Sequence, residues 1–222
     1  MCPSIQRGYR SVISSESEAR ELVAGLCGPD SIARFELLID HLRVENRRQN
    51  LVSTASLDSV WQRHIADSVQ LLRHVSRETA VDLWLDLGTG AGFPGLAIAI
   101  ARPDWNVRLV ESRKRRVEWL AAMVAALDLR QCRIEGKRLE LVDPFPASVI
   151  SARAFAPLPK LLDLSRRFST DHTLWLLPKG RSAGHEVSEL PRQLRRMFHV
   201  EPSLTDPESG IVVGRAKEAK PA

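Results

Sequence analysis

A short glycine-rich stretch constrains the fold of this chain more than any other feature. The apolar run from Val81 to Leu87 includes Asp86 near its end, and four glycines follow within the eight residues 88–95. Alternating apolar residues favour a half-buried β-strand, and glycines are needed where φ is positive or where a ligand lies against bare backbone. A helix starting after the glycines offers unpaired N–H groups and the positive end of its dipole. The stretch therefore predicts a strand, a tight turn and a helix around a nucleotide-like ligand.

Strands and helices alternate after this turn, which is typical of an α/β protein with a parallel sheet. Asp86, Glu111, Arg153 and Lys179 fall at the carboxyl ends of predicted strands. Ligands of such sheets bind at that edge, so we expect these four side chains to share one site. Strands are predicted to end at 86 and to span 107–110, 132–135, 148–152, 173–177, a stretch near 199 and 211–213; helices are predicted at 93–101, 113–127, 158–167 and 186–197.

The first third of the chain has a helical pattern instead. Residues 1–15 show no periodicity and are expected to be disordered or loosely attached. Helices are predicted at 17–26, at about 30–42 and at 57–75. In the third helix His64, Asp67 and Ser68 fall inside the apolar stripe. Such a polar trio is either a buried histidine satisfied by its neighbours or a patch that meets a substrate, and composition does not choose between them. We predict a helical extension at 1–78, packed on a core domain at 79–222.

Composition and charge limit the class of protein. The 222 residues are 44% hydrophobic and 27% charged, which is ordinary for a globular protein, and the net charge of +5 permits a polyanionic partner. The three cysteines are widely separated and lack metal-ligand spacing, so we expect no metal site and a reducing, cytoplasmic location. No apolar run reaches the length of a membrane span. Arginines cluster at 43–48 and 192–196, where they either contact phosphates or lie on solvated helix faces.

Two ligand classes fit the glycine turn. A Walker phosphate loop is excluded because no Gly-Lys-Ser/Thr follows. Residues 90–95 satisfy G-x-G-x-x-G, and Glu111 lies about 20 residues on, as expected for a dinucleotide or for the ribose of S-adenosylmethionine. We expect Asp86 to face the glycines, where a carboxylate suits the cationic end of S-adenosylmethionine better than a pyrophosphate. Electrostatics therefore favours the methyl donor, with a dinucleotide-dependent oxidoreductase as the alternative.

Several motifs together resemble one known family. The chain is similar to the glucose-inhibited division protein B family, the bacterial 16S ribosomal RNA guanine-N7 methyltransferases of the small subunit, from about residue 50 to residue 179. The motifs are NL at 50–51, RHIADS at 63–68, LDLGTGAGFPG at 85–95, RLE at 138–140, SARAFA at 151–156 and PKG at 178–180. The chain departs from the family pattern at Val52, where threonine is usual, and at 208–210, where an arginine is often found.

The resemblance implies a class I methyltransferase fold, Rossmann-like, with a seven-stranded, mostly parallel sheet and an N-terminal helical extension. It implies that S-adenosylmethionine binds as cofactor and leaves as S-adenosylhomocysteine. The residues expected to bind it are Asp86, Gly88, Gly90, Phe93, Glu111, Leu139, Glu140 and Arg153. The residues expected to face the target are Asn50, His64, Asp67, Ser68 and Lys179.

A guanine-N7 target needs no catalytic base, because N7 has an in-plane lone pair and no proton. We therefore expect His64 and Arg153 to act in catalysis by positioning. The expected partner is 16S ribosomal RNA or the small subunit, with no membrane partner and a monomeric protein. A non-catalytic RNA-binding module on the same fold remains a second alternative.

Overall fold

The computed structural model describes residues 12–76 and 80–215. Most of the segment 1–15 and the predicted domain boundary at 78 lie outside these residues. For residues 12–15, which the structure describes, the expectation of loose attachment is wrong. The Ile13 side chain is 2% exposed, and its backbone N–H donates to the carbonyl of Leu204 at 2.7 Å. Ser15 then caps the first helix by accepting from the N–H of Glu18.

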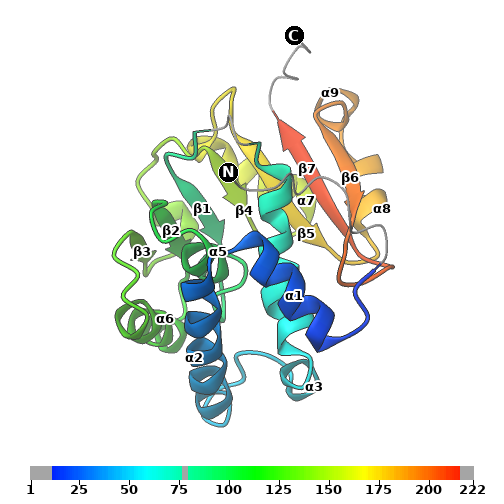
Figure 1. Ribbon diagram of the computed structural model, residues 1–222. Helices are drawn as coiled ribbons and strands as arrows, with labels where there is room; N and C mark the ends of the chain where they lie inside the picture. The colour runs from blue at the N-terminus through cyan, green and yellow to red at the C-terminus, as the bar shows by residue number, and fades with distance from the viewer. Residues whose placement is uncertain (1–11, 77–79, 216–222) are drawn as a thin grey trace.

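The core of the protein is one seven-stranded sheet (Figure 1). Its strands are β1 (Trp84–Leu87), β2 (Val107–Val110), β3 (Cys132–Glu135), β4 (Val149–Ser151), β5 (Leu174–Lys179), β6 (Phe198–Pro202) and β7 (Gly210–Arg215). The spatial order is β3-β2-β1-β4-β5-β7-β6, and β7 runs antiparallel to both of its neighbours. The predicted strands and the predicted α/β fold class are confirmed. Strand order reverses between β1 and β4, where sheets of this kind bind ligands.

Side-chain alternation divides the sheet between two hydrophobic clusters. Trp84, Val107 and Leu176 point into one cluster, and their sequence neighbours Leu85 and Leu177 point into the other. This period of two is what a strand covered on both faces requires. Helices therefore pack on each side of the sheet.

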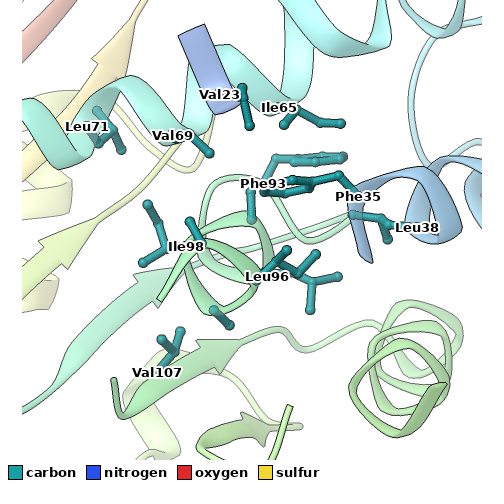
Figure 2. Close-up of a cluster of buried hydrophobic side chains, with 14 of the residues drawn as sticks. Val23, Phe35, Leu38, Ile65, Val69, Leu71, Phe93, Leu96, Ile98 and Val107 are labelled. Atoms are coloured by element: carbon teal, nitrogen blue, oxygen red, sulfur yellow. The ribbon is translucent and has the colours of Figure 1, made fainter. Parts of the chain in front are cut away.

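The helices within residues 16–74, for which we keep the name extension, share the first cluster with residues 80–215, for which we keep the name core domain. The elements of the extension are α1 (Glu16–Leu26), α2 (Pro29–Glu45), α3 (Thr54–Leu57), the π-helical η1 (Trp61–Ala66), α4 (Asp67–Val69) and the 3₁₀-helical η2 (Gln70–His74). Figure 2 shows Val23, Phe35 and Ile65 of the extension packed with Phe93 and Ile98 of the core domain. Full burial of a side chain like Phe35 contributes about 1.5–3 kcal/mol, so this contact anchors the extension to the core domain.

Helices of the core domain cover both faces. They are α5 (Gly95–Ala101), α6 (Lys114–Ala126), η3 (Leu139–Leu141), α7 (Leu158–Ser165), η4 (Arg166–Phe168), α8 (Ala183–Ser188) and α9 (Arg192–Arg195). The apolar side chains of α5 and α6 join the cluster of the extension, and those of α7 fill the opposite cluster. The predicted helix at 186–197 is interrupted, because Pro191 has no N–H and restricts the residue before it.

The predicted helix at 57–75 also differs from the observed segment. Its hydrogen bonding changes from π at Trp61–Ala66 to 3₁₀ at Gln70–His74. Glu16 accepts from the N–H groups of Trp61 and Gln62, at 2.9 and 2.8 Å, and so caps the π-helical segment from α1. The carbonyl of Arg63 also accepts from the side chain of Arg153. These side chains, distant in sequence, stabilise a geometry that local propensity does not indicate.

Candidate active site

The glycine turn brings backbone and aromatic ring into direct contact. Gly88 directly follows β1 with φ +63°, a conformation that L side chains rarely adopt. A Cβ atom added to Gly88 would lie 2.4 Å from Cδ2 of Phe155. The turn and the loop after β4 therefore approach as closely as they do only because Gly88 has no side chain.

Asp86 lies beneath the turn and does not face a cavity. Its side chain is fully buried, and its carboxylate accepts from the N–H of Gly95 at 2.9 Å and from the hydroxyl of Ser151 at 2.7 Å. Burial raises the pKa of Asp86 to about 6, although these hydrogen bonds oppose the rise. The carboxylate thus joins β1, β4 and the start of α5, and donor contact by Asp86 stays a prediction.

Glu111 holds the turn from the neighbouring strand. Its carboxylate accepts from the N–H groups of Gly90, Ser112 and Arg113 at 2.8–3.1 Å. A carboxylate accepts about four hydrogen bonds, so one position remains for a ligand hydroxyl. Glu111 is 6% exposed and contributes to the wall of an open cavity.

We call this cavity the donor pocket. Its volume is about 410 Å³, within the range of small-molecule sites. Of the residues predicted to bind the donor, Gly88, Glu111, Leu139 and Glu140 line it. Gly90 and Phe93 are buried outside the lining, and Arg153 lines a neighbouring cavity. The rim is basic, with Arg113, Arg116, Lys137, Arg138 and Lys160.

We call the neighbouring cavity, of about 380 Å³, the target pocket. The guanidinium of Arg153 lies at its wall, donating to Asp67 Oδ2 at 3.0 Å and to the carbonyl of Arg63 at 3.1 Å. Its other nitrogen contacts Nδ1 of His64 at 3.1 Å. His64 stacks on Phe93 with 5.0 Å between ring centroids, and the Arg153 guanidinium lies 5.5 Å from the same ring. Phe93 therefore supports this network from below.

These contacts fix the protonation state of His64. A guanidinium can only donate, so Nδ1 accepts and the ring proton lies on Nε2, which donates to the hydroxyl of Ser56 at 2.9 Å. Burial, together with the positive charges of Arg153 and Arg63, lowers the pKa of His64 to about 3. His64 is thus neutral at physiological pH, and its basic nitrogen is already occupied.

The other predicted target-facing residues lie in different environments. Asn50 is exposed and lies outside the lining of the target pocket. Ser68 is 1% exposed, and its hydroxyl donates to the carbonyl of His64 at 2.6 Å, so it supports the helix. Lys179 does line the target pocket, but its ammonium group contacts Ala156 and Glu186. Of the five residues predicted to face the target, His64 and Asp67 are the two whose side chains both line the target pocket and contact Arg153.

Sequence reasoning missed several residues of the site. Ser56 completes the contacts of His64, and Thr205 donates to Asp67 Oδ1 at 2.9 Å. Asp206 pairs with Arg63 at 3.0 Å. Asn46 shapes the turn at residues 50–53 by accepting from the N–H groups of Leu51 and Val52. Phe155 lies within a motif quoted above, and its place in that motif was the one available signal.

The sheet order, the glycine turn after β1 and the acidic residue after β2 define a class I S-adenosylmethionine-dependent methyltransferase. Comparison with known proteins gives the family. The family model described as rRNA small subunit methyltransferase G matches residues 31–205, and the chain belongs to this family.

Curated relatives agree with this assignment. Ribosomal RNA small subunit methyltransferase G of Erythrobacter litoralis is 58% identical over 206 residues, which cover 93% of this chain and 99% of that protein. The protein of the same name from Novosphingobium aromaticivorans is 56% identical over 86% of this chain and 83% of its own length. Among solved structures, a methyltransferase from Geobacter sulfurreducens matches with a TM-score of 0.59 at 13% identity, covering 81% of this chain and 89% of that one.

The described residues offer neither a metal site nor a membrane-spanning helix. In the parts of the chain that the structure describes, no three histidine, cysteine or acidic side chains come together as a metal site. Within the same residues, no helix is long and apolar enough to span a membrane.

Proposed function

We propose that this protein transfers a methyl group from S-adenosylmethionine to N7 of a guanine in 16S ribosomal RNA. Family membership supports the reaction class, and the names of the curated relatives support ribosomal RNA of the small subunit as substrate. The observation that carries the proposal is the contact between two cavities. Ala154 lines both the donor pocket and the target pocket, so a donor and a target base can meet there.

The residues of the donor pocket fit S-adenosylmethionine. Glu111 retains one acceptor position for a ribose hydroxyl, and the side chain of Leu139, 4% exposed, offers an apolar wall for an adenine. Gly88 and the ring of Phe155, which rests on its backbone, form a further part of the wall. When bound, S-adenosylmethionine supplies an electrophilic methyl group on a sulfonium.

The target pocket is suited to positioning a base rather than to removing a proton. Guanine N7 needs no deprotonation, and His64 is neutral with its Nδ1 held by Arg153. Correct alignment of two reactants alone lowers a barrier by roughly 7–11 kcal/mol. We infer that Arg153, His64 and Asp67 hold the target base in line with the donor.

The proposed target is an unstacked guanine. N7 lies on the major-groove edge, which A-form RNA hides in a deep, narrow groove. The basic rim of the donor pocket and the exposed arginines at 43, 47 and 48 offer contacts for RNA phosphates. We expect RNA affinity to fall as the salt concentration rises.

Methyl transfer from tritiated S-adenosylmethionine tests the proposal. Small-subunit RNA from a strain lacking this protein is expected to accept label at one guanine, while RNA from the parent strain is already modified and accepts little. Presenting naked 16S RNA and intact subunits in parallel identifies the form of the substrate. A protein that binds RNA but incorporates no label into either would be the non-catalytic module of the second alternative.

The pH–rate profile tests the absence of a base. Because the pKa of His64 is about 3 and that of Asp86 about 6, the methyl-transfer rate at saturating donor is expected to stay flat between about pH 7 and 8.5, above both values. A steep dependence in that range would contradict the base-free scheme. The family does not favour the dinucleotide alternative, and NADH fluorescence is expected to stay unchanged on titration. We further propose that the protein acts in the cytoplasm as a monomer, which equilibrium sedimentation would check.

A further inference from the structure

The loop between β4 and α7, residues 152–157, separates the two pockets. Ala154 in this loop lines both of them and has φ +51°, a conformation that costs an alanine about 1–2 kcal/mol. A loop in such a conformation persists only when its surroundings hold it there. Neighbouring side chains must therefore hold the loop between β4 and α7.

Phe155 makes the position of the loop matter for the donor pocket. Its ring lines that pocket and rests on the backbone of Gly88, since an added Cβ would lie 2.4 Å from the ring. Any shift of the loop therefore moves the aromatic wall of the donor pocket relative to the glycine turn.

Lys179 and Glu186 hold the far end of the loop. Lys179 Nζ donates to the carbonyl of Ala156 and to Glu186 Oε2, each at 2.8 Å. Glu186 Oε2 also accepts from the N–H of Leu158 at 2.8 Å. Pro157 lies between these two backbone groups and has no N–H of its own. A single ion pair thus fixes the backbone on both sides of Pro157 and caps α7, whose N-cap residue gives no side-chain hydrogen bond.

The ion pair is only slightly exposed to solvent. The Lys179 side chain is 9% exposed and that of Glu186 is 19% exposed, and Ser182 donates to Glu186 Oε1 at 2.8 Å. Burial raises the pKa of Glu186, but the hydrogen bonds from Lys179, Ser182 and Leu158 outweigh it and leave the pKa below its usual value. Removing either Lys179 or Glu186 leaves the charge of the other poorly solvated. Loss of the ion pair is therefore expected to disturb the loop.

We propose that Lys179 is a positioning residue for the donor pocket, acting through Glu186 and the Ala156 carbonyl to keep Phe155 against Gly88. This inference rests on the proposed function, because it takes the cavity at Gly88 as the donor pocket. It replaces the sequence-based expectation that Lys179 contacts the RNA.

The test compares four variants of the full chain: Lys179→Met, Lys179→Arg, Glu186→Gln and, as a matched control, Lys114→Met, whose side chain is 91% exposed. Calorimetry measures the affinity for S-adenosylhomocysteine, and amide hydrogen exchange measures protection of residues 154–158. Lys179→Met is expected to weaken the affinity roughly tenfold and to speed exchange at Leu158, because it removes charge-assisted hydrogen bonds. Glu186→Gln is expected to act in the same direction, and Lys179→Arg to restore most of the affinity.

Binding to deproteinised 16S RNA without donor separates the two roles of Lys179. If Lys179 positions the loop, the RNA affinity of Lys179→Met should stay within about twofold of that of the Lys114→Met control, because the ammonium group does not contact RNA phosphates. Unchanged S-adenosylhomocysteine affinity and exchange, with weakened RNA binding, would overturn the proposal in favour of an RNA contact. If Lys179→Met does not fold, Glu186→Gln carries the same comparison. If the unmodified protein fails to bind S-adenosylhomocysteine, the proposed function fails, while exchange at Leu158 still reports on the ion pair.

Discussion

The donor pocket and the target pocket are built in different ways. Polar groups of the donor pocket are held by nearby backbone, as when Glu111 accepts from the N–H groups of Ser112 and Arg113. Polar groups of the target pocket are held by side chains far apart in the sequence. Arg153 reaches Asp67 across 86 residues, and Thr205 reaches Asp67 across 138. The donor pocket thus belongs to the core domain, while the target pocket exists only when the extension, the β4–α7 loop and the β6–β7 loop come together.

The strongest test of this difference removes the donor pocket alone. Gly88→Asp places a side chain at φ +63° against the Phe155 ring, so S-adenosylhomocysteine binding is expected to fall below detection in calorimetry. Affinity for 16S RNA should be retained. Gly25→Asp is the control, because nothing lies within 4 Å of a Cβ atom at that position. Donor binding that survives Gly88→Asp would mean that the pocket lies elsewhere.

The reverse experiment disables the target pocket. Arg153→Met removes the donors to Asp67, His64 and the Arg63 carbonyl, and kcat for methyl transfer is expected to drop on the order of a hundredfold through misplacement of the base. The affinity for S-adenosylhomocysteine should change less than in Lys179→Met, because Lys179 and Glu186 still hold the far end of the loop beyond Phe155. Arg130→Met, at a position where the side chain is 82% exposed, controls for loss of charge. A parallel loss of donor affinity would show that the two pockets are not separable.

Asp86, buried beneath the glycine turn, gives a pH-dependent signal. Its pKa of about 6 is above that of an unfolded aspartate, so the native state binds more protons between pH 4 and 6. Stability contributed by this group therefore falls as pH rises through that window and is constant above it. Relative to Asp86→Asn, the free energy of unfolding of the unmodified protein should decline by about 2–3 kcal/mol from pH 4 to 7 in urea titrations. Parallel profiles for the two proteins would contradict a raised pKa.

The smallest expected effect comes from the cap that the extension supplies. Glu16→Gln leaves one acceptor oxygen for the N–H groups of Trp61 and Gln62, which weakens the π-helical segment presenting His64. A loss of roughly 1 kcal/mol is expected in urea unfolding, with a severalfold decrease in kcat and unchanged donor affinity. Glu21→Gln, on an exposed position of α1, is the matched control. An equal decrease in both variants would assign the effect to charge rather than to the cap.

What could be predicted from the sequence follows the same division. Apolar runs with period two located the strands, and with them the sheet edge where Glu111, Arg153 and Lys179 lie. Glu111 could be placed because it directly follows a predicted strand and lies about 20 residues after the glycine turn. The shared family motifs indicated the reaction class, which the comparisons confirm.

Contacts between distant segments could not be predicted. Nothing in the sequence near His64 indicates that Arg153 occupies its Nδ1, or that Asp206 pairs with Arg63. The prediction for Asp86 was incomplete for a different reason. The comparisons confirm the sulfonium donor, and Asp86 does contact Gly95 of the glycine turn. The sequence argument did not foresee that Asp86 is fully buried on the face of β1 that Trp84 shares, where it also contacts Ser151. The alternation of β1 contained that information.

Phe93 has a consequence for recombining parts of this chain with parts of other proteins. It belongs to the glycine turn by sequence, yet its ring is buried with Phe35, Ile65 and the stacked ring of His64 from the extension. A chimera that joins this extension to the core domain of a distant relative would bring together two surfaces that were never shaped for each other. Such a chimera is therefore expected to unfold at lower urea concentrations than this chain, because the ring of Phe93 would lose its matched partners.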